Sequence, residues 1–288
     1  MTSVDRNPFR AGLLANRTLL ITGGGTGLGR SAALKCASLG ARVALVGRRE
    51  EPLRTTAGDI EKAGGRAAFA TCDVRDAASV VGAFDSIEAT LGPVNALINN
   101  AAGNFLCASE DLSDNAFDSV VKIVLYGTFN CTRELGRRLI KAKKEGHVLS
   151  IVTSYAATGS AFVLPSASAK AGVLAMMRSL AVEWATYGIR LNAIAPGPFP
   201  TEGAFSRLMA GDLEKKALDR VPSKRFGDHE ELANLIAYML SDASPYQTGD
   251  CVTIDGAEGL FSGQQFAGFA HLDRAAAKAL MTSIKPKK

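Results

Sequence analysis

The chain of 288 residues is 47% hydrophobic and 21% charged, a composition typical of a globular protein that buries a full core. Its net charge of +5 is not gathered into a basic helix stripe or interleaved with aromatic residues, which argues against a nucleic-acid-binding protein. No apolar segment has the length of a membrane span or a secretory signal. The positive charge therefore indicates either a solvated basic surface or a site for anionic small ligands.

Cysteine and histidine usage restricts the chemistry further. The five cysteines are scattered and contain no Cys-x-x-Cys pair, so we expect buried free thiols in a reducing compartment. The three histidines share no metal-ligand spacing, so we expect no metal. The last three residues, Pro-Lys-Lys, do not form a peroxisomal address, and we therefore expect a cytoplasmic location.

Short apolar runs alternate with helical patterns from one end of the chain to the other. We expect strands at Arg17–Thr22, Val43–Val46, Ala67–Cys72, Ala96–Ile98, Val148–Val152, Arg190–Ile194 and Val252–Ile254. Helices are expected at Arg30–Leu39, Glu51–Ala63, Ala77–Leu91, Asn115–Lys141, Ala169–Tyr187 and Glu230–Leu240, with short helices in Ala204–Arg220. This alternation predicts one α/β, doubly wound Rossmann-type domain over residues 1–288, with a parallel seven-stranded sheet and helices on both faces. Residues 1–16 would be an N-terminal arm and residues 258–288 a C-terminal extension.

A glycine-rich turn joins the first predicted strand to the first helix. In Thr22-Gly-Gly-Gly-Thr-Gly-Leu-Gly29 the glycines are spaced Gly-x-x-x-Gly-x-Gly. Glycines there allow a tight turn and let the backbone approach a pyrophosphate at a helix N-terminus. Plain turn chemistry is the alternative, but the flanking strand and helix favour a dinucleotide site. The candidate cofactor-binding residues in this turn are Gly23, Gly25, Thr26, Gly27, Leu28 and Gly29.

The end of the second predicted strand indicates which dinucleotide binds. An NAD-selective site places Asp or Glu there to bind the ribose diol, whereas this chain has Gly47-Arg48-Arg49. A guanidinium suits a 2′-phosphate, so the sequence predicts NADP(H), with Arg48 as the main contact. Arg30, beside the last glycine, is a candidate second charge. The alternative is that the two arginines are exposed at a solvated helix start.

The stretch Thr153–Lys170 leaves a predicted strand and enters a long helix, and it carries a tyrosine, several hydroxyls and a lysine. Together with the glycine turn, it resembles the short-chain dehydrogenase/reductase family. This resemblance implies that Asp73-Val74 contacts adenine and that Asn100 follows the fourth strand in the family's Asn-Asn-Ala-Gly element. It also implies that Pro196, Gly197 and Phe199 belong to the nicotinamide-side loop.

The chain departs from this family at its usual active site, Tyr-x-x-x-Lys. Lys170 is in place, but Ser166 stands four positions earlier, where the family carries its tyrosine. Val124 stands where the family carries an asparagine, and Thr153 is a plausible substitute for its serine. Either the chain is an inactive relative that senses NADP, or the missing groups have moved.

Tyr155 and Asn104 are the candidates for moved groups, because both lie on loops that leave adjacent strands at their carboxyl ends. The alternatives are a tyrosine buried for packing and an asparagine that serves only a turn. Within the family, the closest resemblance is to the NADPH-dependent 2,4-dienoyl-CoA reductases. It rests on Ala101-Ala-Gly-Asn-Phe105, Ile123-Val-Leu-Tyr-Gly127, Tyr155-Ala-Ala-Thr-Gly-Ser160, Pro165-Ser-Ala-Ser-Ala-Lys-Ala-Gly-Val173, Pro196-Gly-Pro198 and Thr201-Glu-Gly-Ala-Phe-Ser-Arg207.

This closer resemblance implies reduction of a 2,4-dienoyl-CoA to the 3-enoyl-CoA in unsaturated fatty acid degradation, by a homotetramer. Tyr155, Asn104, Ser166 and Lys170 would be catalytic, and Arg75, Phe105, Ser113 and Arg207 would bind the acyl-CoA. Glu202 stands at a position that is basic in relatives. Two alternatives remain open: reduction of another acyl-CoA or carbonyl substrate, such as a 2-enoyl or 3-oxoacyl thioester, and a non-catalytic NADP-binding regulator.

Overall fold

The structure, a computed structural model, describes residues 9–201, 213–261, 273, 275, 276, 278 and 279. Its centre is a parallel sheet of seven strands in the order β3-β2-β1-β4-β5-β6-β7. The strands are β1 (Thr18–Thr22), β2 (Arg42–Gly47), β3 (Arg66–Thr71), β4 (Ala96–Asn99), β5 (Gly146–Ile151), β6 (Ile189–Pro196) and β7 (Cys251–Ile254). The predicted doubly wound fold is confirmed.

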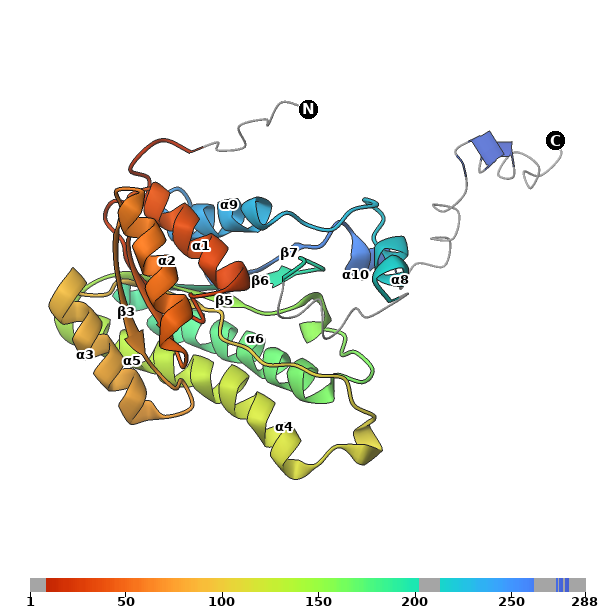
Figure 1. Cartoon of the computed structure of the whole chain (residues 1–288), viewed down its shortest axis with the longest axis horizontal. Coiled ribbons are helices and arrows are strands. Elements are labelled where there is room, and N and C mark those ends of the chain that lie inside the picture. Colours follow the sequence, from red (N-terminus) through yellow and green to blue (C-terminus); the bar gives the residue numbers. More distant parts are fainter. Residues whose placement is uncertain (1–8, 202–212, 262–272, 274, 277, 280–288) are drawn as a thin grey trace.

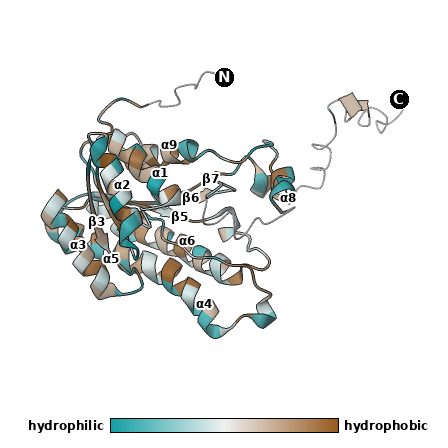
Figure 2. Ribbon diagram, viewed as in Figure 1, coloured by the Kyte–Doolittle hydropathy of each residue, from teal (hydrophilic) through white to brown (hydrophobic). Residues whose placement is uncertain are grey.

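Helices cover both faces of this sheet (Figure 1). They are α1 (Gly27–Ser38), α2 (Glu50–Lys62), α3 (Ala77–Leu91), α4 (Asp114–Val121), α5 (Gly127–Ala142), α6 (Leu164–Trp184), α8 (Leu213–Arg220), α9 (His229–Leu240) and the short α10 (Glu258–Phe261). One apolar core lies between the sheet and α1, α2 and α9, and a second lies between the sheet and α3, α4, α5 and α6. The covering helices carry both hydrophobic and hydrophilic residues (Figure 2), as helices with one buried face should.

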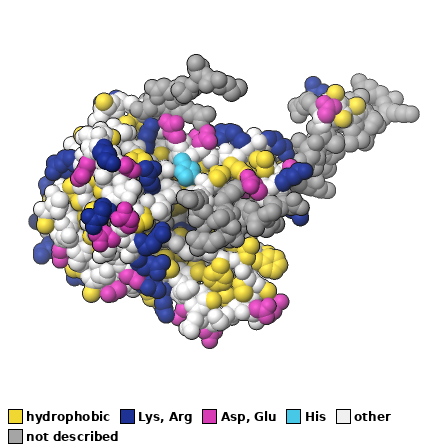
Figure 3. Space-filling view, in the orientation of Figure 1, with side chains coloured by type: hydrophobic (Ala, Val, Ile, Leu, Met, Phe, Trp, Pro, Cys, Tyr) yellow, Lys and Arg dark blue, Asp and Glu magenta, His cyan; other side chains and the backbone are white. Residues whose placement is uncertain are grey.

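The continuous burial of the strands explains why their sequences are apolar without alternation. All residues of β1, β4, β5 and β6 are buried, because helices pack on both sides of the sheet. No helix in the described part of the chain has the length and apolarity needed to cross a membrane. On the face shown in Figure 3, basic and acidic side chains are interspersed.

Two predicted helices differ from the observed ones. The helix predicted from Ala169 begins at Leu164, because Pro165 fits the first turn of a helix, where no backbone N–H is needed. Ser166 is therefore a helical residue. The single helix predicted over Asn115–Lys141 is instead α4 and α5 joined by η2, a π-helical turn at Lys122–Tyr126. Such turns often accompany functional sites.

Of the short helices predicted over Ala204–Arg220, α8 lies within the described residues, and positions 202–212 lie outside them. The cysteines are all free, and Cys36, Cys72 and Cys131 are buried. Strand order reverses between β1 and β4, because β2 and β3 continue on one side and β5 to β7 on the other. In an open α/β sheet, ligands bind at this point, outside the carboxyl ends of the strands.

Candidate active site

A cleft of about 1800 Å³ lies at the carboxyl ends of the strands, where the strand order reverses. Its volume exceeds the roughly 300–1,000 Å³ typical of a single small-ligand pocket. The cleft therefore has room for a dinucleotide and a second substrate together. Residues from the glycine turn, from the ends of β2 to β6 and from the segment that follows β7 line it.

The glycine turn forms one wall of the cleft because its backbone folds too tightly for side chains. A Cβ atom at Gly29 would lie 2.4 Å from the Gly23 carbonyl oxygen, so glycine at this position lets α1 approach the end of β1. Asn100 fastens the turn to β4: its side-chain Nδ2 donates to the carbonyl oxygen of Thr22 at 3.0 Å. All the predicted cofactor-binding residues line the cleft except Gly29, which faces the turn itself.

The end of β2 carries the positive charge predicted to select the cofactor. Arg48 and Arg49 are exposed and line the cleft, as does Asp73 from the end of β3. The pKa of Asp73 is lowered, chiefly by hydrogen bonds from Arg75, and the charge of Arg48 adds to that lowering. Arg30, the candidate second charge, instead forms an ion pair with Asp59 at 2.8 Å.

Three of the predicted catalytic side chains meet at one point. The Asn104 amide Nδ2 donates a hydrogen bond to the Tyr155 hydroxyl at 3.3 Å. The same hydroxyl lies 3.4 Å from Ser166 Oγ. Tyr155 is only partly buried and lines the cleft, so it is not a core packing residue. Asn104 also accepts a bond from the backbone N–H of Phe105, so it both shapes its loop and reaches Tyr155.

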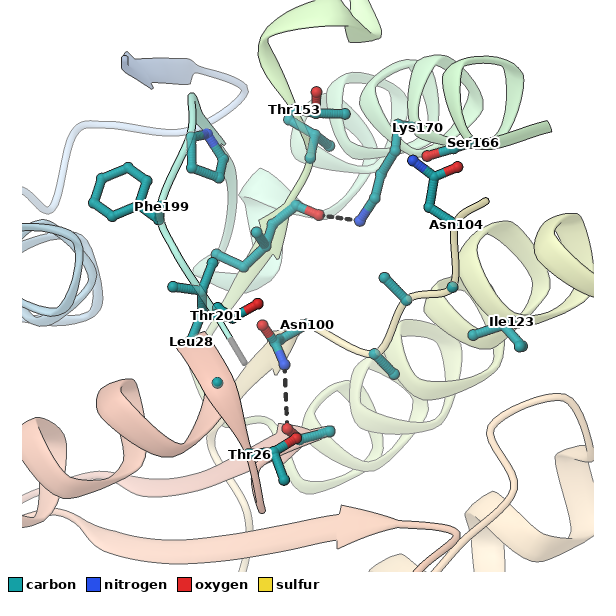
Figure 4. A pocket seen from close by; sticks show the side chains of 18 of the residues that line it. Thr26, Leu28, Asn100, Asn104, Ile123, Thr153, Ser166, Lys170, Phe199 and Thr201 are labelled. Atoms are coloured by element: carbon teal, nitrogen blue, oxygen red, sulfur yellow. Dashed lines mark hydrogen bonds between the residues drawn. The ribbon is translucent and has the colours of Figure 1, made fainter. Parts of the chain in front are cut away.

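The loop after β5 holds Tyr155 in this position. Thr153 Oγ1 accepts a hydrogen bond from the Tyr155 backbone N–H at 3.3 Å, at the start of a short 3₁₀ turn. Thr153 also lines the cleft. Figure 4 shows Asn104, Ser166 and Lys170 on one side of the cleft and Phe199 and Thr201 on the other.

Lys170 is the charged group beneath this cluster. Its side chain is buried, lines the cleft and donates to the backbone oxygen of Ile151. Burial lowers its pKa to about 8. The amine therefore carries a proton at neutral pH and loses it under mildly alkaline conditions.

Val124 occupies the position of the family's asparagine but cannot take over its polar role. It lies in the π-helical turn with no exposed surface, packed in the core between the sheet and α5 and α6. Because it has no polar side-chain atom, the polar cluster of this site depends on Asn104.

Three of the residues predicted to bind acyl-CoA are not among the described residues that line the cleft. Arg75 is paired with Asp73, with Nε at 2.9 Å from Oδ1. Ser113 caps α4 by accepting from the backbone N–H of Ala116, and Phe105 packs against the core. Their role in binding stays a prediction. Arg207 and Glu202 lie outside the described residues.

Two charged residues of the cleft were not predicted from the sequence. Arg220, at the end of α8, and Glu258, at the start of α10, line it and lie 3.9 Å apart. Burial raises the pKa of the Glu258 carboxyl, against the opposing effect of Arg220. No local motif marks either residue, because each reaches the cleft only through the path of the chain around β7.

Comparison with known proteins is consistent with this geometry. The family model described as enoyl-(acyl carrier protein) reductase matches residues 23–257. A probable 2,4-dienoyl-CoA reductase of Caenorhabditis elegans is 44% identical over 269 residues, covering 91% of this chain and 87% of that protein. A probable 2,4-dienoyl-CoA reductase of Bacillus subtilis is 41% identical over 249 residues, covering 86% of this chain and 98% of that protein.

A crystal structure of a short-chain dehydrogenase from Bacillus anthracis superimposes with a TM-score of 0.79 at 40% identity, covering 88% of this chain and 99% of that chain. Membership of this family implies a nicotinamide cofactor, and the glycine turn, with no room for a Cβ at Gly29, fits one. The chain therefore belongs to the short-chain dehydrogenase/reductase family and is an oxidoreductase.

Proposed function

We propose that this oxidoreductase reduces 2,4-dienoyl-CoA thioesters to 3-enoyl-CoA with NADPH. The observation that carries the proposal is the contact between the Asn104 amide and the Tyr155 hydroxyl, with Ser166 beside them. These groups replace the family's usual tyrosine in the same cleft as Lys170. The names of the relatives at 41–44% identity support the same substrate class.

The donors suit a substrate whose oxygen gains charge without needing a full proton. NADPH, when bound, supplies the hydride. Reduction at Cδ of a conjugated dienoyl thioester places negative charge on the thioester oxygen. The amide of Asn104 has two N–H groups, so one can donate to Tyr155 and the other to that oxygen. The Tyr155 hydroxyl accepts from Asn104, which leaves its own proton for the same oxygen.

Lys170 and Ser166 support this pair. Lys170 is charged below about pH 8 and buried in the cleft wall, so its field stabilises a developing anion nearby. Ser166 Oγ lies within reach of the Tyr155 hydroxyl and holds it in place. Lys170 would also bind the nicotinamide ribose.

The choice of NADPH rests on Arg48. This arginine lines the cleft where NAD-selective sites carry an acidic residue, and its guanidinium can bind a 2′-phosphate. The matched test compares Arg48→Ala with Arg54→Ala, an exposed arginine of the next helix that pairs with Glu50. Only Arg48→Ala should raise the KM for NADPH, by about ten- to a hundredfold, with little change for NADH. Equal use of NADPH and NADH by the wild type would refute this selectivity.

The position that receives the proton determines the product. Protonation at Cα gives the 3-enoyl-CoA that we propose, whereas protonation at Cγ gives the 2-enoyl-CoA. The names of the relatives include both outcomes: the nematode protein is called (3E)-enoyl-CoA-producing and the B. subtilis protein (2E)-enoyl-CoA-producing. Product analysis is therefore part of the test.

The test is NADPH oxidation with a panel of dienoyl-, 2-enoyl- and 3-oxoacyl-CoA substrates, followed by identification of the product in deuterated water. We expect turnover of the dienoyl-CoA, with one deuterium at Cα. Turnover of a 2-enoyl- or 3-oxoacyl-CoA alone would assign another thioester substrate. NADPH binding without any turnover would identify a regulator.

We also propose a homotetramer in the cytoplasm. Phe129 on α5 and Val182 on α6 are large exposed apolar side chains on helices that cover one face of the sheet, which supports association through these helices. Light scattering tests the assembly. Fluorescence microscopy of the tagged full chain tests the location, and punctate organelles would contradict it, since relatives from mouse and zebrafish are named peroxisomal.

A further inference from the structure

His229 joins two walls of the cofactor half of the cleft, although no part of the proposed chemistry uses it. It is the first residue of α9, a helix that packs beside α1 in the core on that face of the sheet. Its two ring nitrogens form hydrogen bonds with two different segments, at Ser31 of α1 and at Pro200 of the loop after β6. These segments are far apart in the sequence and come together only in the fold.

The hydrogen-bond chemistry fixes the orientation of this link. His229 Nε2 lies 2.6 Å from the Pro200 carbonyl oxygen, which can only accept, so Nε2 carries a proton. His229 Nδ1 lies 2.8 Å from Ser31 Oγ. In the neutral ring, Nδ1 has no proton and accepts a hydrogen bond from the Ser31 hydroxyl, whose single proton is shared with the Gly27 carbonyl oxygen at 3.2 Å. The neutral ring thus donates a hydrogen bond to the loop after β6 and accepts one from α1.

Both segments border the cofactor. Ser31 lies one turn inside α1, whose first residue, Gly27, belongs to the glycine turn that lines the cleft. Pro200 lies between Phe199 and Thr201, which both line the cleft and lie across it from Asn104 and Lys170 in Figure 4. A Cβ atom at Gly27 would lie 3.3 Å from the Thr201 methyl carbon, so the two walls lie close together at the cleft itself.

The segment just before α9 makes a second contact with the loop after β6. The Phe199 ring is buried, and a Cβ atom at Gly227 would lie 2.3 Å from it. The backbone N–H of Gly227 donates to the Pro198 carbonyl oxygen at 3.1 Å. His229 extends this support by two residues, to Pro200, and adds the connection to α1.

We infer that His229 is a positioning residue for the cofactor, which holds the loop Pro196–Thr201 at a fixed distance from the glycine turn. This inference rests on the proposed use of NADPH. Without the imidazole, the cofactor itself must order the loop when it binds. The free energy spent on this ordering lowers the affinity for NADPH. The loss of one net hydrogen bond predicts a Kd about three- to tenfold higher.

Direct binding of NADPH, followed by the fluorescence of its nicotinamide without any acyl-CoA, tests this inference. His229→Ala should raise the Kd for NADPH about three- to tenfold, while kcat at saturating NADPH stays within about twofold. His229→Gln keeps an amide donor for the Pro200 oxygen and should restore most of the affinity. Ser31→Ala, which removes the connection to α1 together with the hydrogen bond from Ser31 Oγ to the Gly27 carbonyl oxygen, should show an intermediate Kd.

Glu230→Ala is the matched control, because Glu230 is the neighbouring residue and is exposed outside the cleft lining. It pairs with Lys35 of α1 at 3.8 Å, so its removal breaks a contact between α9 and α1 without touching the loop after β6. The Kd of this variant should equal that of the wild type. An unchanged Kd in His229→Ala, or equal losses in His229→Ala and His229→Gln, would overturn the inference. A wild type that binds NADPH but reduces no dienoyl-CoA would contradict the proposed function and leave the binding comparison intact.

Discussion

Tyr155 and Asn104 reach one point of the cleft from loops that follow different strands, and the chemistry that we propose for the site rests on their hydrogen bond. At the position of the family's tyrosine, Ser166 contributes a hydroxyl that is nearly fully buried and only 3.4 Å from Tyr155. We propose that the phenol has moved from this position in α6 to the loop after β5, while Lys170 has stayed. The variants that follow separate the roles of these residues.

We predict that Tyr155→Phe lowers the rate of hydride transfer about 10²–10³-fold, because it removes one donor to the developing oxyanion. The ring is kept, so the NADPH affinity and the melting temperature should stay close to the wild type. Ser166→Ala should lose less, since its hydroxyl acts through Tyr155. Single-turnover hydride transfer is the measurement.

Asn104→Ala provides the second arm of the same experiment. Asn104 and Tyr155 are hydrogen-bonded to each other, and we propose that both donate to one oxygen. The losses in the double variant should therefore not add. A near-normal rate in Tyr155→Phe would exclude the tyrosine as a donor. Strict additivity would show that the two side chains act on different atoms.

We predict that Lys170 gives the site a pH dependence in which activity and stability change in opposite directions. Its pKa in the folded protein is about 8 against an ordinary value of 10.5, because burial disfavours the charge. Between these two values the unfolded chain binds a proton that the folded chain does not. Stability should therefore rise with pH over this range, by up to about 3 kcal/mol, while kcat/KM falls as the charge is lost.

Urea unfolding and kcat/KM, both measured from pH 7 to pH 10, check this prediction. The stability of Lys170→Met should not rise with pH over this range as that of the wild type does. This variant should also be inactive. Lys170→Arg keeps its charge over the whole range, so any residual activity should not fall above pH 8. Parallel stability curves for wild type and Lys170→Met would refute the assigned titration.

At the scale of elements, close approach between segments decides where glycine is required. Gly29 lets α1 approach the end of β1, and a methyl group there would meet the Gly23 oxygen at 2.4 Å and Asn100 Nδ2 at 2.6 Å. Gly58, in the middle of α2, has no atom within 4 Å of such a group. Glycine is therefore required for steric reasons at position 29, whereas no close contact requires it at position 58.

Gly29→Ala should destabilise the protein by about 1–3 kcal/mol through overpacking and should weaken NADPH binding. Gly58→Ala should instead stabilise it by about 0.5–1 kcal/mol, because alanine restricts the unfolded chain and favours the helix. Denaturant unfolding and NADPH titration of both variants are the measurements. Destabilisation by Gly58→Ala would show a hidden contact at α2.

At the scale of the whole molecule, a polar cluster lies at the amino ends of the central strands, opposite the carboxyl ends where the cleft lies. His147, at the start of β5, accepts a hydrogen bond at Nδ1 from Arg190 Nη2 at 2.6 Å. Burial, together with the charges of Arg17 and Arg190, lowers the pKa of His147 to about 2. The carboxylate of Asp242 lies 3.9 Å from Nε2 but is largely exposed.

We predict that His147 contributes to acid unfolding of the whole fold. Below pH 6.5 the unfolded chain protonates this histidine and the folded chain does not, so stability is lost as the pH falls. From pH 6.5 to pH 5 the loss is about 2 kcal/mol. His147→Gln retains an acceptor for Arg190 and should show a smaller loss over this range in urea unfolding. Equal slopes in the two proteins would contradict the prediction.

The sequence by itself determined the alternation of strands and helices, the dinucleotide turn and the departure at Ser166. These features are local: each is encoded within a few to about twenty residues, by burial on both sheet faces, by glycine conformations or by spacing from Lys170. The sequence also placed Asn104 and Tyr155 at the same edge of the sheet, because parallel strands end there together.

Only the tertiary structure decided which of these side chains touch. Asn104 and Tyr155 are 51 residues apart, and Ser31 and His229 are 198 residues apart, so their bonds depend on how separate loops fold over the sheet. The π-helical turn around Val124 and the approach of Arg220 to Glu258 depend on packing between elements in the same way. Contacts at hydrogen-bond distance are set by the summed packing of many elements, which no local pattern in the sequence contains.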